Sequence, residues 1–121
     1  MHYKIHAIDV KNALKNYIWL LEDTITKEVV AVDPTDADLV TAFCEQHQLH
    51  LKQIWLTHWH RDHTDGVQGL LAKQNILVYG PRDEISKIPL ISNPLQHNDH
   101  FLFHDLKVEI IATPGHTLGH I

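Results

Sequence analysis

The chain has 121 residues, of which 44% are hydrophobic and 21% are charged, and its formal net charge is −5 at pH 7. These values are ordinary for a globular domain, and the length favours one domain with a modest core over a disordered chain or several domains. The negative charge argues against a surface for nucleic acid and leaves a small metabolite as the more natural partner.

The N-terminal residues contain no apolar run of signal-peptide length, and no stretch approaches the length of a membrane span. We therefore expect no membrane partner and take the cytoplasm as the default location. The single cysteine, Cys44, excludes an intrachain disulfide and fits a reducing compartment. Because Cys44 lies among Leu39, Val40 and Phe43 in an apparent amphipathic helix, we expect it to pack that helix rather than act as a nucleophile.

The first part of the chain predicts three short strands, at residues 3–8, 17–21 and 28–32. The segment between the second and third strands has turn character, so we expect an antiparallel meander. Pro34 ends the third strand. Thr35 or Asp36 can then cap a helix that runs to about His47.

The central part of the chain alternates strands with a short helix. Residues 52–57 form an apolar run that predicts a buried strand. After Gly66, apolar residues recur with helical spacing from Val67 to Ile76 and predict a short helix. Residues 76–79 predict another strand, which Gly80 and the proline after it are expected to end.

The last part of the chain predicts a loop followed by two paired strands. Residues 82–99 have mixed polarity and further prolines, so we expect a loop with at most one short helical turn. Residues 101–103 and 106–112 predict strands that pair with each other. Strands that first pair locally and then alternate with helices favour an α/β fold with a mixed sheet.

Residues 57–66 read THWHRDHTDG and contain four candidate metal ligands, which are His58, His60, Asp62 and His63. His58 and His60 are two positions apart, so in an extended segment both rings project to the same side and one ion can bind both. Asp62 and His63 are adjacent, so the chain must turn there to present both of them. The Thr-Asp-Gly sequence that follows allows such a turn, which can face a second ion beside the first.

A chance cluster is the alternative interpretation, because the chain has twelve histidines. The flanking sequence argues against it. A strand, a ligand loop and a helix in this order are a common way for open α/β sheets to build a site at the carboxyl end of a strand. The spacing differs from the helical H-E-x-x-H pattern, so the sequence indicates a site at a strand end rather than on a helix face.

A second informative segment, TPGHTLGHI, occupies residues 113–121 and follows the last predicted strand. Its Pro-Gly pair can form a tight turn that directs His116 inward. His116 is therefore the leading third ligand for the ion that His58 and His60 bind. Three imidazoles and an open position are typical of a catalytic zinc site, whereas structural zinc sites are closed by four protein ligands.

The two segments together resemble the metallo-β-lactamase superfamily, which carries T-H-x-H-x-D-H followed by a histidine on a later loop. Within it, the chain resembles the hydroxyacylglutathione hydrolases, also called glyoxalase II. The resemblance implies an α/β fold, the N-terminal half of an αββα sandwich with a mixed sheet and flanking helices. It is carried, in the same order along the chain, by NYIW at 16–19, VDP at 32–34, IWLTH at 54–58, VYGP at 78–81 and ATPGHTLGHI at 112–121.

The resemblance also implies roles for individual residues. His58, His60 and His116 would bind the first metal, and Asp62 and His63 would bind the second and act in catalysis. Asp33 would orient a ligand histidine through the other N–H of its ring, although a simple turn residue before Pro34 is an equal alternative. His120 is likewise either a supporting residue beside the ligands or a structural one.

The chain departs from the family pattern in two respects. Where the family has Gly-Gly after the Asp-His pair, this chain has Asp65 and Gly66, and we expect Asp65 to be a tolerated turn residue. The family enzyme is also longer, and its bridging aspartate, last metal histidine and glutathione-binding residues would fall after Ile121. We therefore expect residues 1–121 to form an incomplete metallo-β-lactamase-like domain, with an incomplete second metal site and exposed edges that favour self-association.

The implied activity is the metal-dependent hydrolysis of a glutathione thioester, from a hydroxyacylglutathione to glutathione and a 2-hydroxy acid. In such enzymes a hydroxide held by two metal ions attacks the thioester carbonyl. Zn²⁺ is the expected metal, with two ions in a complete enzyme, although iron and manganese also suit imidazole and carboxylate ligands. Two alternatives remain open, namely a mononuclear iron oxidoreductase of the same fold, similar to persulfide dioxygenases, and an inactive metal-binding fragment.

Overall fold

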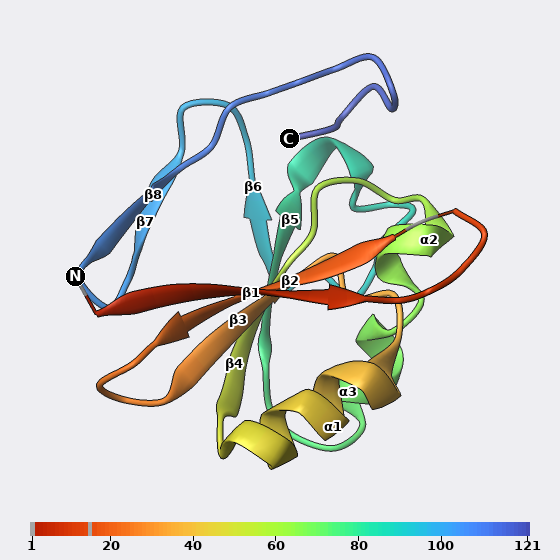
Figure 1. Ribbon diagram of the computed structural model, residues 1–121. Helices are drawn as coiled ribbons and strands as arrows, with labels where there is room; N and C mark the ends of the chain where they lie inside the picture. The colour runs from red at the N-terminus through yellow and green to blue at the C-terminus, as the bar shows by residue number, and fades with distance from the viewer. Residues whose placement is uncertain (1, 15) are drawn as a thin grey trace.

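The computed structural model describes residues 2–14 and 16–121. Strands β1 (Tyr3–Asp9), β2 (Tyr17–Asp23) and β3 (Glu28–Val32) pair antiparallel and form one side of a mixed sheet (Figure 1). The predicted meander is thus confirmed, with β2 extending beyond its expected end.

Helix α1 (Ala37–His47) packs against one face of this sheet. It begins as the sequence predicts, because the Asp36 side chain accepts a hydrogen bond of 3.1 Å from the Leu39 N–H. Val40 and Cys44 are its buried residues. Burial raises the pKa of the Cys44 thiol to about 11, which leaves the thiol protonated at neutral pH. Its predicted role in helix packing is therefore confirmed.

Strands β4 (His50–Trp55), β5 (Leu77–Pro81) and β6 (Asn93–Leu95) continue the sheet in parallel, in the order β1-β2-β3-β4-β5-β6. Helix α3 (Val67–Leu71) contacts α1 and lies on the same face of the sheet (Figure 1). Because β3 and β4 are parallel neighbours, their carboxyl ends lie side by side. The residues just after β3 and β4, including Asp33, therefore meet at one edge of the sheet.

The expected end of β5 and the expected loop after it are partly wrong. Gly80 lies within the strand and pairs with Pro94 of β6, and β5 continues through the residue after it. Strand β6 was not predicted, because three residues with a central proline carry no alternating pattern. A proline fits there because β6 is the edge strand of the sheet. The single helical turn expected in this region is present as η1 (Arg82–Glu84).

The segment around Gly66 also differs in detail from the prediction. The turn expected at the Asp-His pair is one helical turn, α2 (Arg61–Thr64). Helix α3 is shorter than expected, and Ile76 lies outside it, buried just before β5. Gly66 itself is required by a close approach, since a Cβ there would overlap the Pro34 carbonyl oxygen and lie 2.8 Å from the Ala37 nitrogen. The ligand loop, which is the segment from Thr57 to Gly66 that carries the first four candidate ligands, is thereby held against the start of α1.

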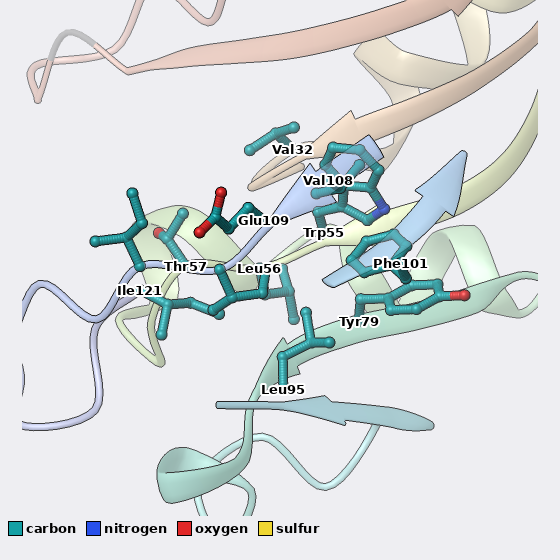
Figure 2. Close-up of a pocket in the computed structure, with 12 residues that line it drawn as sticks. Val32, Trp55, Leu56, Thr57, Tyr79, Leu95, Phe101, Val108, Glu109 and Ile121 are labelled. Carbon is teal, nitrogen blue, oxygen red and sulfur yellow. The ribbon is translucent and has the colours of Figure 1, made fainter. Parts of the chain in front are cut away.

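Strands β7 (His100–Phe103) and β8 (Leu106–Glu109) pair antiparallel as a separate hairpin. Their pairing is confirmed, although β8 is shorter than predicted. The hairpin lies on the side of the sheet opposite the helices (Figure 1). Together with the sheet it lines an open, largely apolar pocket, in which Phe101 stacks on Tyr79 at 4.4 Å between ring centroids and lies perpendicular to the ring of Trp55 (Figure 2). Among the described residues, no helix is long and apolar enough to cross a membrane.

Candidate metal centre

The site begins where the parallel strands β3 and β4 end. The Asp33 N–H donates to the Trp55 carbonyl oxygen at 2.9 Å, which extends the register of the two strands by one step. The Asp33 carboxylate then accepts two hydrogen bonds from Thr57, at 2.9 Å from its N–H and at 2.7 Å from its hydroxyl. Asp33 has a φ of 50°, a left-handed conformation that aspartate tolerates better than most residues. The carboxylate is thus fixed directly beneath the ligand loop.

Three of the predicted ligands come together in space. One ligand atom each from His58, His60 and His116 lies within 4.8 Å of the others. The His60 Nδ1 and His116 Nε2 atoms are 3.0 Å apart, although 56 positions separate the two residues in the sequence. The loop after β4 and the loop that carries His116 thus bring the three histidines together, which is the group of ligands that we expected from the sequence.

His58 is the buried member of this cluster, with 2% of its surface exposed. The Thr57 hydroxyl donates to Asp33, so it accepts a hydrogen bond from the His58 Nδ1–H at 2.8 Å. That arrangement leaves the lone pair on Nε2, and this buried atom has no hydrogen-bond partner among the described residues. Burial, followed by the charge of His63, lowers the pKa of His58 to about 4, which keeps the ring neutral. A neutral imidazole with a free, buried nitrogen fits a metal ligand.

Asp62 and His63 both lie on α2 and face each other, with 3.3 Å between Asp62 Oδ2 and His63 Nε2. The Asn16 amide donates to the Asp62 backbone oxygen at 2.7 Å and to its carboxylate at 3.3 Å. Partial burial acts to raise the pKa of Asp62, but the Asn16 amide and the His63 ring together lower it. Asp62 is therefore an ionised carboxylate beside an imidazole nitrogen, and the two form a pair of potential ligand atoms.

His63 is oriented by Asp33, whose Oδ2 lies 3.0 Å from the His63 Nδ1. This hydrogen bond raises the pKa of His63 and directs its Nε2 away from Asp33. One potential ligand atom each from Asp33, His58 and His63 also lies within 4.8 Å of the other two. Both Asp33 oxygens already accept hydrogen bonds, from Thr57 and His63, so the geometry favours Asp33 as the residue that orients ligands rather than as a ligand.

The remaining candidate residues lie around the cluster. The His120 ring stacks on His58 at 4.5 Å between centroids, and its Nδ1 is 2.9 Å from the Thr113 hydroxyl. His120 therefore lies against the ligands without joining either three-residue group. Asp65 is exposed, as expected of a turn residue. Glu84, a buried carboxylate that accepts hydrogen bonds from the loops of His58 and His116, was not predicted from the sequence, because no local motif marks it.

The neutral state of His58 predicts a pH dependence for the metal-free chain. The folded-state pKa of about 4 lies below the ordinary value of 6.5, so the unfolded chain takes up a proton first as the pH falls. We expect His58 to cause no change of stability with pH above pH 6.5. As the pH falls from 6.5 towards 4, it should progressively lower the free energy of unfolding. Urea unfolding at several pH values measures this dependence. The His58→Gln variant, which does not titrate there, should show a shallower loss, and equal slopes would contradict the assignment.

No protein-family model matches the chain. The hydroxyacylglutathione hydrolase of Marinomonas sp. (strain MWYL1) is 42% identical to it over 106 residues, which are 88% of this chain and 40% of that protein. The chain is thus similar to hydroxyacylglutathione hydrolases along most of its length. It spans about 40% of the length of the curated relatives that it matches.

The solved structures identify the fold. The B3 metallo-beta-lactamase BLEG-1 superposes with a TM-score of 0.82 at 23% identity, covering 97% of this chain and 65% of that one. ETHE1 from Myxococcus xanthus superposes with a TM-score of 0.81 at 23% identity, covering 97% of this chain and 51% of that one. The chain therefore has the metallo-β-lactamase fold, and the α/β class with a mixed sheet predicted from the sequence is confirmed.

Proposed function

We propose that this chain, which has the metallo-β-lactamase fold, carries the metal centre of a hydrolase that cleaves hydroxyacylglutathione thioesters. The observation that carries the proposal is the convergence of His58, His60 and His116 in a sequence 42% identical to a hydroxyacylglutathione hydrolase. On the same basis we propose that residues 1–121 act as one metallo-β-lactamase-like unit. Glutathione and a 2-hydroxy acid would be the products.

The donor atoms suit Zn²⁺, which favours imidazole nitrogen and carboxylate oxygen at catalytic sites. In the proposal, His58, His60 and His116 hold a first ion, and Asp62 and His63 contribute to a second. Two protein ligands are few for tight binding, so a second ion would draw further ligands from water or from other groups. A bound divalent ion of this kind lowers the pKa of water to about 7 and polarises a carbonyl oxygen.

Residues next to the proposed ligands orient the histidine rings for metal binding. Thr57 and Asp33 fix the proton of His58 on Nδ1, and Asp33 does the same for His63, so both rings present Nε2 to the site. His58 closes the inner side, because it is almost completely buried. His116 is exposed, so the thioester carbonyl is expected to approach from its side.

Hydrolysis of S-lactoylglutathione by the Zn²⁺-loaded chain tests the proposal. We expect thiol release at least about tenfold faster than with the same concentration of free Zn²⁺, because the protein-bound ion supplies activated water next to the carbonyl. A thiol-reactive dye measures the release, and a chelator should abolish it. The His116→Ala variant is the matched control for the bound ion. A folded, Zn²⁺-loaded chain that leaves the thioester intact would instead indicate a metal-binding module without this activity.

A mononuclear iron oxidoreductase of the same fold is the second candidate. The observation that favours it is the cluster of Asp33, His58 and His63, since two histidines and one carboxylate are a common set for non-haem iron. The hydrogen bonds that already occupy both Asp33 oxygens argue against that set. Metal analysis separates the candidates, because bound zinc supports the hydrolase, whereas one iron with oxygen-dependent turnover supports the oxidoreductase.

A further inference from the structure

We infer that Glu84 is a positioning residue that holds the two ligand loops at the separation at which their histidines share one metal ion. The inference rests on the metal centre proposed above. Glu84 is the last residue of η1 and only 5% of its surface is exposed. One carboxylate oxygen accepts the Trp59 N–H at 2.8 Å, and the other accepts the Gly119 N–H at 2.9 Å.

The two amides that Glu84 binds belong to different ligand loops. Trp59 lies between the ligands His58 and His60, and Gly119 lies in the loop that carries His116. A backbone hydrogen bond of 3.0 Å from Ile121 to Thr57 joins the same loops at another point. Glu84 supplies a side-chain link to both loops, and its hydrogen bonds are of the charge-assisted type, which are shorter and stronger than neutral ones.

Glu84 projects from a turn that is itself fixed in the core. Its backbone carbonyl oxygen accepts from the N–H groups of Lys87 at 2.9 Å and Ile88 at 3.0 Å. The Ile88 side chain is 4% exposed and belongs to the hydrophobic core. The Lys87 ammonium group lies 4.4 Å from the centroid of the Trp59 ring, which adds a second contact between this turn and the first loop. The carboxylate is therefore an anchored support rather than a mobile side chain.

Gly119 gives independent evidence that the second loop is fitted to Glu84. A Cβ at this position would lie 2.6 Å from the Glu84 Cγ and 3.1 Å from the Asp83 Cβ. Any larger residue would have to move the loop away from the turn. The absence of a side chain at Gly119 thus permits the close approach that its hydrogen bond to Glu84 requires.

The Glu84→Gln variant tests the inference through metal affinity. Glutamine keeps one acceptor but turns an N–H₂ group towards the other backbone N–H, so one link is lost. We expect the affinity for Co²⁺, followed by its absorption spectrum, to fall about tenfold, as is typical when a residue that supports metal ligands is changed. Asp83→Asn is the matched control, because Asp83 is an exposed carboxylate in the same turn, and it should stay within about twofold of the parent chain.

A double-variant cycle separates positioning from a general structural role. If Glu84 acts by bringing the loops together, Glu84→Gln should change Co²⁺ affinity by less than about twofold when His116→Ala has already removed the second loop's ligand. Amide hydrogen exchange at Trp59 and Gly119 in the metal-free chain should also become faster in Glu84→Gln. If that variant does not fold, Gly119→Ala disturbs the same contact from the other side and should give the same loss.

Three results would overturn the inference: unchanged Co²⁺ affinity in Glu84→Gln, an equal loss with and without His116, or unchanged amide exchange. A parent chain that binds no Co²⁺ at all would instead contradict the proposed metal centre. In that case the amide exchange still decides whether Glu84 joins the two loops, so the two failures can be told apart.

Discussion

Replacing His58 with alanine should lower the affinity of the chain for Zn²⁺ by about 100-fold or more, a larger effect than the 10- to 100-fold typical of residues that only support ligands. His58 belongs to both three-residue groups of potential ligands, so its loss removes a donor from each. Its Nε2 is also the buried nitrogen that lacks a hydrogen-bond partner among residues 2–14 and 16–121. Competition with a chromogenic chelator, followed by metal analysis after dialysis, measures the change.

Loss of binding in His58→Ala should not reflect unfolding. Removing the ring relieves the cost of an unpaired buried nitrogen, about 1–3 kcal/mol, but it also leaves a cavity at a buried position. Because these two effects oppose each other, we expect the metal-free variant to keep a cooperative urea transition, which shows that it is folded. His50→Ala removes an exposed histidine from the start of β4 and serves as the control. Equal Zn²⁺ affinity in the two variants would contradict the three-histidine site.

The elements that could be predicted from the sequence are those in which apolar and polar residues recur with a clear period. Buried Ile18 and Leu20 alternate with half-exposed Tyr17 and Trp19 along β2, which is the pattern of a strand with one buried face. Helix α1 is marked at its start by Asp36. Strand β6 and helix α2 have three and four residues, too few for a period to show. Their conformation depends on neighbours that are distant in the sequence.

The same distinction applies to the site. The spacing of His58 and His60 predicted two ligands on one side of the chain, and the Pro-Gly turn after the last predicted strand indicated His116 as the third. The supporting residues are held by contacts over longer separations, such as Asn16 with Asp62, 46 positions apart, and Glu84 with Trp59, 25 positions apart. Those contacts follow from the three-dimensional arrangement of the sheet and its loops. A single sequence carries no local signal for them.

The Asp33→Asn variant should lower metal affinity by about 10- to 100-fold, because Asp33 orients two of the proposed ligands at once. Asparagine suits the left-handed backbone at this position and can still accept from the Thr57 N–H. Its N–H₂ group, however, cannot accept from the Thr57 hydroxyl or from His63. The hydroxyl would then no longer hold the His58 proton on Nδ1, and His63 would lose the partner that fixes its tautomer.

The His63 ring provides the readout that separates this role from a loss of stability. Its hydrogen bond to Asp33 raises the pKa of His63, so in the metal-free chain this group stabilises the fold below the ordinary pKa of 6.5, and the contribution disappears as the pH rises through the raised value. In Asp33→Asn, an NMR titration should show a lower pKa for His63, and the stabilising contribution of the protonated His63 at low pH should shrink. Asp65→Asn removes an exposed carboxylate from the segment that carries His63, and it should leave both metal affinity and the His63 titration close to those of the parent chain. If Asp33→Asn leaves both quantities as unchanged as Asp65→Asn does, the hydrogen bonds of Asp33 do not orient the ligands.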